Sequence, residues 1–142
     1  GLLAGIEKYS GSIIRQLSSS PKFVARNTAM LSSRTEDTMS QVLKKPEKWG
    51  RFVESAAGAH IINNSKKGNY TLYYWRQGND EIDYVLRKEG KVIGLEVKSG
   101  HTAKRSGMDA FSRIYKPDKV LLVGEKGISM EEFLKEDPAG MF

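Results

Sequence analysis

From residue 47 onward, apolar positions recur at intervals of three and four residues, beginning at Trp49 and continuing to Ile61. This spacing places them on one face of an amphipathic α-helix. Pro46 suits the first turn of such a helix, where a backbone N–H has no partner in any case. Asn63 and Asn64, together with Gly68, are the signals for its end. The pattern therefore predicts a long helix with a wide apolar stripe, packed against a core.

Three short segments rich in aromatic and β-branched residues come after this helix, at residues 69–76, 81–87 and 92–98. Their composition and spacing predict three antiparallel strands. Glu89 and Gly90 are placed to form the tip of the second hairpin, since Gly supplies the positive φ that a two-residue turn needs. We therefore expect a meander of three strands after the helix.

The C-terminal part continues with a predicted helix over residues 104–115 and a nearly wholly apolar segment at 119–124. The apolar segment is typical of an interior strand, and the helix before it predicts a crossover that makes the strand parallel to its predecessor. Ser129 and Glu132 form a capping box that opens a last short helix. The order helix, three strands, helix, strand, helix predicts an α/β domain with a mixed sheet flanked by helices.

The first part of the chain is less regular. Residues 6–17 predict a short helix, and the loop signal ending at Pro21 separates this helix from the rest of the chain. Residues 33–46 are polar and read as a loop or a short helix. We therefore expect a partly helical N-terminal extension or linker over residues 1–46 and a domain over residues 47–142.

The predicted hairpin tip fixes which residues of the second and third strands face each other. Lys88 pairs with Lys91, and stepping outward places Asp83 opposite Glu96. Lys98 projects on the same side as Glu96, because alternate strand residues share a face. Two facing carboxylates repel and should destabilise the hairpin, whereas a metal cation bound by both would reverse that effect. The opposite face should be buried and carries Ile82, Tyr84, Leu86, Ile93, Leu95 and Val97.

This arrangement predicts a metal site with catalytic potential. Asp83 and Glu96 supply the oxygen ligands that Mg²⁺ or Mn²⁺ prefers, and the backbone carbonyl of Val97 is a natural third ligand. Glu54 would hold a second metal or a metal-bound water if its helix packs against the charged face. The ammonium group of Lys98 would position a nucleophilic water and stabilise charge on a phosphate. These residues are the candidate catalytic set.

Simpler interpretations stay open for the same residues. Asp83, Glu96 and Lys98 would then form a surface hairpin with ordinary ion pairs. Glu54 would pair with a nearby arginine or lysine at the edge of its helix. His60 lies on the apolar stripe, where a packed histidine is commoner than a metal ligand.

Composition and charge limit the classes of protein to which this chain can belong. The 142 residues carry a net charge of +6 in short, dispersed clusters, which permits a nucleic-acid partner without requiring one. Cysteine is absent, which excludes disulfides and thiolate metal sites and favours a reducing, cytoplasmic setting. No apolar run approaches the roughly 18 residues of a membrane-spanning helix, so no membrane association is expected. The chain begins at Gly1 and reads as a piece of a longer protein.

The set of a helix Glu, a hairpin Asp and a Glu-x-Lys pair resembles the PD-(D/E)xK nuclease superfamily. The resemblance implies a restriction-endonuclease-like αβββαβ core, which is the order predicted above. It assigns Glu54 to the acid of the first helix, Asp83 to the metal-binding position, and Glu96 with Lys98 to the signature pair. The sequence departs from the motif before Asp83, where residues 81–82 stand in place of Pro.

A closer resemblance covers nearly the whole chain. It is to the C-terminal domain, of unknown function, of a prokaryotic AAA-type ATPase family. Seven separated motifs carry it in order: residues 19–22, 27–29, 49–54, 74–76, 81–85, 96–100 and 132–134. The resemblance implies a preceding P-loop ATPase module in the same polypeptide. No phosphate-binding Gly-x-x-x-x-Gly-Lys-Ser/Thr segment occurs in this chain, so ATPase activity would belong to that module.

The favoured function is Mg²⁺- or Mn²⁺-dependent hydrolysis of phosphodiester bonds in DNA, by Glu54, Asp83, Glu96 and Lys98. One alternative is a non-catalytic module that uses the same fold to bind nucleic acid or protein as an accessory to the ATPase. Another is a structural domain that mediates oligomerisation.

Overall fold

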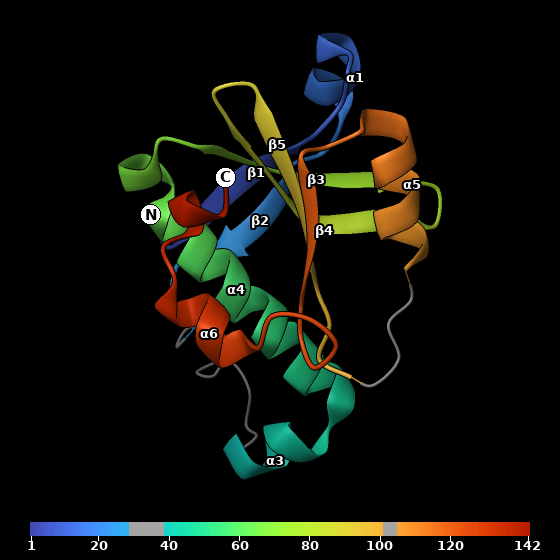
Figure 1. Ribbon diagram of the computed structural model, residues 1–142. Helices are drawn as coiled ribbons and strands as arrows, with labels where there is room; N and C mark the ends of the chain where they lie inside the picture. Colours follow the sequence, from blue (N-terminus) through green and yellow to red (C-terminus); the bar gives the residue numbers. More distant parts are fainter. Residues whose placement is uncertain (29–38, 101–104) are drawn as a thin grey trace.

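The structure is a computed structural model that describes residues 1–28, 39–100 and 105–142. A mixed sheet of six strands forms its centre, with the spatial order β2-β1-β3-β4-β5-β6. Helices cover both faces of this sheet (Figure 1). The predicted mixed α/β architecture is therefore confirmed. The strands are β1 (Leu3–Lys8), β2 (Lys22–Ala25), β3 (Thr71–Gln77), β4 (Asp80–Lys88), β5 (Lys91–Val97) and β6 (Lys119–Val123).

The long helix α4 runs diagonally across one face of the sheet, and α5 lies on the other (Figure 1). Among the described residues, no helix combines the length and the apolar character needed to cross a membrane. The helices are α1 (Ile13–Ser18), α3 (Met39–Lys44), α4 (Pro46–Gly68), α5 (Ser106–Tyr115) and α6 (Met130–Lys135), followed by the 3-10 turn η1 (Pro138–Met141).

Helix α4 begins as predicted, and it continues through Asn63 and Asn64 to Gly68. Pro46 occupies the first position, and Asn69 ends the helix in a left-handed conformation with a φ of 54°. Its buried side chains include Val53, Ala57 and Ile61, which lie four residues apart on one face. They pack with the sheet residues that face α4, so the predicted apolar stripe contributes to the core on this face of the sheet.

The β4–β5 hairpin also forms as predicted. Glu89 and Gly90 have φ angles of 49° and 80°, and two positive values are the mark of a turn whose twist matches the strands. Lys88 pairs with Lys91, and the ladder continues inward without a shift. The register that placed the two carboxylates opposite each other is thus confirmed over the paired part of the hairpin.

The crossover after β5 is confirmed as well. β6 pairs with β5 in parallel, and α5 connects the two strands. Helix α5 begins at Ser106, whereas residue 104, where we predicted its start, lies outside the described residues. Ser129 caps α6 by accepting a hydrogen bond from the backbone N–H of Glu132 at 3.2 Å.

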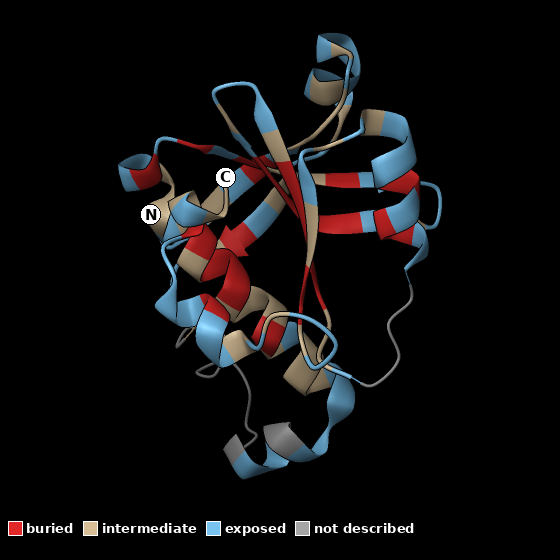
Figure 2. Cartoon of the chain, in the orientation of Figure 1, coloured by how far each residue is buried: buried red, intermediate tan, exposed pale blue. Residues whose placement is uncertain are grey.

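The N-terminal prediction was wrong in part. Residues 3–8 do not join a helix but form β1, which pairs antiparallel with β2 and parallel with β3. Pairing lets Ile6 and Val24 become buried against α4, and this tertiary gain overrides the local helical pattern. Helix α1 covers only the end of the predicted segment and contributes no buried residue (Figure 2). Within residues 33–46, α3 confirms a short helix, and residues 33–38 lie outside the described part.

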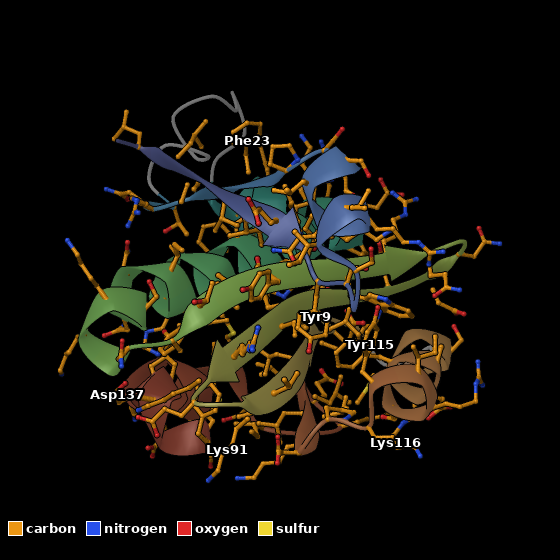
Figure 3. The ribbon with its side chains drawn as sticks, turned by 90° about the horizontal axis from the view of Figure 1, so that it is seen from above. Tyr9, Phe23, Lys91, Tyr115, Lys116 and Asp137 are labelled. Atoms are coloured by element: carbon orange, nitrogen blue, oxygen red, sulfur yellow. The ribbon has the colours of Figure 1, made fainter. Side chains whose placement is uncertain are left out.

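The outer surface of this N-terminal segment is unusually apolar. Phe23 projects from β2 on the outside of the β1–β2 ribbon (Figure 3). Tyr9, in contrast, packs under α5 against Tyr115, with ring centroids 5.0 Å apart (Figure 3). The first strand and the residue after it therefore tie the N-terminal segment to both sides of the sheet. The exposed large apolar side chains of this segment are Leu2, Leu3, Ile13, Ile14, Leu17 and Phe23.

Candidate functional site

The candidate site lies where the β4–β5 hairpin opens. Tyr84 and Leu95 are the last residues of the two strands that pair, and Asp83 and Glu96 come one step further out. Both acidic residues are buried, at 7% and 3% exposure, and they are the buried charged residues of the described chain. Burial of two carboxyl groups is costly unless each has a polar partner, so their contacts decide what the site does.

A β-bulge in β4 sets the position of Asp83. Tyr73 pairs with Val85, but Trp75 pairs with Ile82, so β4 contains one more residue than β3 over this stretch. Ile82 consequently packs under α5 with Trp75, rather than under α4 with Tyr84. Our prediction for the face of Ile82 was therefore wrong, because the bulge reverses the alternation of faces at Asp83. Bulges commonly change the direction in which a side chain points in this way.

Asp83 bonds to the backbone of the neighbouring strand. Its Oδ2 accepts a hydrogen bond from the Val97 backbone N–H at 2.8 Å. This contact takes the place of a strand-to-strand hydrogen bond at the point where the ladder ends. Because the N–H and C=O of one strand residue point to the same side, the Val97 carbonyl also lies on the side of Asp83.

Glu96 and Asp83 form a buried carboxyl pair. Burial raises the pKa of Glu96 well above its ordinary value, and the hydrogen bond to Asp83 and the charge of Asp83 raise it further. The charge of Lys98 lowers this pKa, but by less than the other causes raise it. At neutral pH the pair therefore keeps a proton. The repulsion expected from the sequence is thus relieved without a metal.

Lys98 is held beside this pair. Its Nζ lies 3.9 Å from Glu96 Oε1, with side-chain exposures of 32% and 4%. Its backbone N–H donates to the Val123 carbonyl at 2.9 Å. Gly124 comes directly after Val123, and an added Cβ there would lie 2.2 Å from the Lys98 carbonyl oxygen. The end of β5 is thus fixed from the β6 side, and Lys98 keeps a partly exposed ammonium group near a buried carboxyl.

Glu54 approaches from the opposite face of the sheet. Helix α4 packs against the face of Tyr84 and Leu95, whereas Glu96 shares its face with Gly94, which lies against Phe111 of α5. α4 therefore covers the face opposite to that of Glu96. Burial raises the pKa of Glu54, and the nearby charge of Asp83 adds to that rise. The charge of Asp83, at the bulge, thus raises the pKa of both Glu54 and Glu96.

Glu54 also has a partner that we did not predict. Lys22 Nζ lies 2.8 Å from Glu54 Oε1 and 5.0 Å from the centre of the Tyr84 ring. The Tyr84 hydroxyl donates to the Glu54 backbone carbonyl at 3.0 Å. The simpler interpretation of Glu54 as half of an ion pair is what the structure contains. Nothing local marks Lys22 as its partner, because the two residues are 32 positions apart.

Among the described residues, no group of three His, Cys, Asp or Glu side chains is arranged to hold a metal ion. The site instead offers two carboxyl groups, Asp83 and Glu96, with the Val97 carbonyl nearby. These are oxygen donors of the kind that Mg²⁺ and Mn²⁺ take. Because two carboxyl groups and a backbone carbonyl are oxygen ligands, the chemistry of the donor set fits such an ion.

Comparison with protein families supplies one match. The sequence model of a family described as Domain of unknown function (DUF4143) matches residues 49–134. The chain belongs to the DUF4143 family. The matched part of this DUF4143 domain contains Glu54, Asp83, Glu96 and Lys98, whereas Lys22 lies before it. No curated protein and no solved structure matches the chain. Membership of a family of domains of unknown function is therefore confirmed, and the ATPase and nuclease resemblances stay predictions.

Proposed function

We propose that this domain is a metal-dependent nuclease that hydrolyses phosphodiester bonds in DNA. The observation that carries the proposal is the buried carboxyl pair of Asp83 and Glu96 with Lys98 beside it. Perturbed titratable groups of this kind cluster at functional sites. The order α4-β3-β4-β5-α5-β6 supports the proposal further, because it is the αβββαβ order of the restriction-endonuclease-like core.

Mg²⁺ or Mn²⁺ would be held by Asp83, Glu96 and the backbone carbonyl of Val97. Such an ion supplies a bound water of lowered pKa and neutralises charge on a phosphate. Glu54 would join the site only after Lys22 leaves it, since their ion pair now occupies the Glu54 carboxylate. That pair is partly exposed, and pairs of this kind contribute little free energy, about 0–1 kcal/mol. Release of Lys22 is therefore inexpensive.

The chain's own groups have distinct tasks in this proposal. Asp83 is fixed by the Val97 N–H, so its free oxygen keeps one orientation. Glu96 gives up its proton when the site is loaded. Lys98 keeps its ammonium group at the edge of the buried pair, where it can contact a phosphate oxygen and orient the attacking water. Its fixed backbone limits how far the ammonium group can move.

Plasmid nicking tests the proposed activity. Supercoiled plasmid is incubated with the protein and Mn²⁺, Mg²⁺ or EDTA, and open-circle DNA is quantified. We expect nicking with either metal, none in EDTA, and none with Asp83→Asn, which keeps the size of the side chain. A protein that binds Mn²⁺ but leaves the plasmid intact would contradict the proposed hydrolysis. Equal nicking by Asp83→Asn would reveal a contaminating nuclease.

The cellular setting is part of the proposal. The resemblance to the C-terminal domain of AAA-type ATPases supports a protein in which a P-loop module of the same polypeptide acts with this domain. The lack of cysteine supports a reducing, cytoplasmic environment. DNA is the proposed partner, and the positive net charge supports it.

One observation favours the second candidate, a non-catalytic module that binds nucleic acid or protein as an accessory to the ATPase. Within the described residues the acidic side chains do not assemble as a group of three, and Glu54 is bonded to Lys22. A retired site would keep such an arrangement at no cost. The plasmid assay separates the two candidates, because the accessory module predicts no nicking by a protein that still binds DNA.

A further inference from the structure

A cleft adjoins the carboxyl pair on the side of the N-terminal segment. It has a volume of about 310 Å³ and is lined by residues 20–22, 74–76 and 81–83. These come from the loop before β2 with the first residue of that strand, the second half of β3 and the first half of β4. Asp83 forms part of its wall, so the cleft leads to the candidate site. Its volume is in the range of small-ligand sites, about 300–1,000 Å³.

Two cations line this cleft. Lys22 Nζ is bonded to Glu54, but the side chains are 33% and 35% exposed, so water and salt weaken the pair. Arg76 is exposed and, within the described residues, has no ion-pair partner. Both cations can therefore contact an anion without losing a strong bond.

The walls of the cleft are fixed in place. Trp75 is 1% exposed and packs between the sheet and α5. The Tyr74 hydroxyl donates to the Ser20 carbonyl at 2.6 Å, which ties the loop before β2 to β3. The partly exposed Tyr74 also presents aromatic surface at the cleft. A site whose walls are already ordered binds without a large entropic cost.

The cleft carries charges of both signs. Glu81 and Asp83 come from β4, Lys22 comes from β2, and Arg76 comes from β3, where it pairs directly opposite Glu81. A polyanion would contact Lys22 and Arg76 and be repelled by the carboxylates of β4. Its backbone would then face the carboxyl pair from a fixed direction.

We propose that this cleft binds the phosphodiester backbone of a nucleic-acid strand next to the bond that is cleaved, with Lys22 and Arg76 contacting its phosphates. The assignment of a neighbouring cleaved bond rests on the proposed nuclease function, whereas the binding itself does not. Lys22 then has two partners, Glu54 in the free protein and a phosphate in the complex. The N-terminal segment, which lies before the family match, supplies part of the substrate site.

Binding is measured in EDTA, where no hydrolysis can occur, by the fluorescence anisotropy of a labelled single-stranded 12-mer. The proteins are wild type, Lys22→Gln, Arg76→Gln and the matched control Lys91→Gln, whose exposed side chain lies at the distant hairpin tip. We expect each cleft variant to bind about 5–10-fold more weakly and the slope of log K against log salt to fall by about 0.7. The control should match wild type.

Further arms sharpen the result. Lys22→Arg keeps the cation and should restore affinity. A purely structural role of the Lys22–Glu54 pair would not explain weaker binding by Arg76→Gln, because Arg76 is not part of that pair. Inorganic phosphate should compete far more weakly than unlabelled 12-mer at equal phosphate concentration. Equal competition would overturn the assignment to a strand and point to a single-phosphate site. Cleft variants that bind like the Lys91→Gln control would overturn the proposal altogether.

The two proposals fail separately. Weaker binding by the cleft variants, with no nicking by any protein, would leave the cleft assignment standing and remove the nuclease. Metal-dependent nicking by wild type, together with normal binding by the cleft variants, would support the nuclease and remove the cleft assignment. Circular dichroism of each variant at the assay temperature excludes unfolding as the cause of lost binding.

Discussion

The two ends of the β4–β5 hairpin are built from the same strands and differ in almost everything else. At the tip, Lys88 and Lys91 pair in a regular ladder closed by a two-residue turn. At the open end the ladder stops, β4 bulges, and Asp83 and Glu96 are buried together. The tip has the tight turn and regular pairing of a stable hairpin. The open end has a bulge and two neighbouring buried carboxyl groups, which are unfavourable in a hairpin. Such local departures are expected where a structure is arranged for function.

The largest difference between the two ends should appear in activity. Lys98→Met, at the open end of β5, should reduce plasmid nicking by about 10²–10³-fold, the usual cost of losing one group that stabilises developing charge. Mn²⁺ binding should persist, because Lys98 is not among the proposed ligands. Lys91→Met removes the same group from the other end of β5 and should leave nicking unchanged. Equal rates for the two variants would remove Lys98 from the mechanism.

A second contrast concerns the backbone contact of Asp83. Asp83→Ala leaves the buried Val97 N–H without its acceptor, whereas Asp83→Asn can still supply one. We expect Asp83→Ala to be less stable than Asp83→Asn by about 1–3 kcal/mol, the cost of an unsatisfied buried donor. Urea unfolding in EDTA measures the difference. Indistinguishable midpoints would mean that the hydrogen bond does not hold the open end together.

A third contrast is in the pH dependence of stability without metal. The folded-state pKa of Glu96 is raised, so its favourable neutral form contributes fully below the unfolded value, about 4.5, and this contribution is lost as pH rises toward the raised pKa. Glu96→Gln has no such loss. Its stability relative to wild type should increase from pH 4.5 to pH 8 by at least about 1.4 kcal/mol, the equivalent of one pKa unit.

Thermal unfolding of wild type and Glu96→Gln across this pH range measures the difference in their stability. Glu89→Gln at the exposed tip is the control for removing a carboxyl group from the same hairpin. A difference between Glu96→Gln and wild type that does not change with pH would show that Glu96 does not keep a proton.

The smallest effect is expected at the tip. Gly90 has a φ of 80°, so Gly90→Ala forces a side chain into the left-handed region and should cost about 1 kcal/mol. Nicking and Mn²⁺ binding should be unaffected below the unfolding temperature, because the tip is far along the ladder from Asp83. Loss of activity in a folded Gly90→Ala variant would show that the two ends are coupled.

The same contrast explains how much the sequence could predict. The tip, the register and the opposition of Asp83 to Glu96 derive from a local signal, the Glu89-Gly90 turn, and from alternation along each strand. The bulge could not be predicted, because it exists only relative to the pairing partner β3. Ile82 was therefore assigned to the wrong face.

Lys22 was missed for a related reason. It enters the site from β2, and β2 forms only because β1 joins the sheet beside β3. The local pattern of residues 6–17 favours a helix, and long-range pairing decides against it for β1. Contacts between distant segments thus fixed the part of the site that local patterns could not indicate.

We propose that Asp83 and Glu96 form a site that exchanges a proton for a divalent cation. Calorimetric titration of Mn²⁺ into the metal-free protein at pH 7 tests it most directly, in two buffers with different enthalpies of ionisation. The account predicts binding that releases a proton, seen as a buffer-dependent heat, and loss of that binding in Asp83→Asn. Absence of binding in wild type, or equal binding by both proteins, would contradict it.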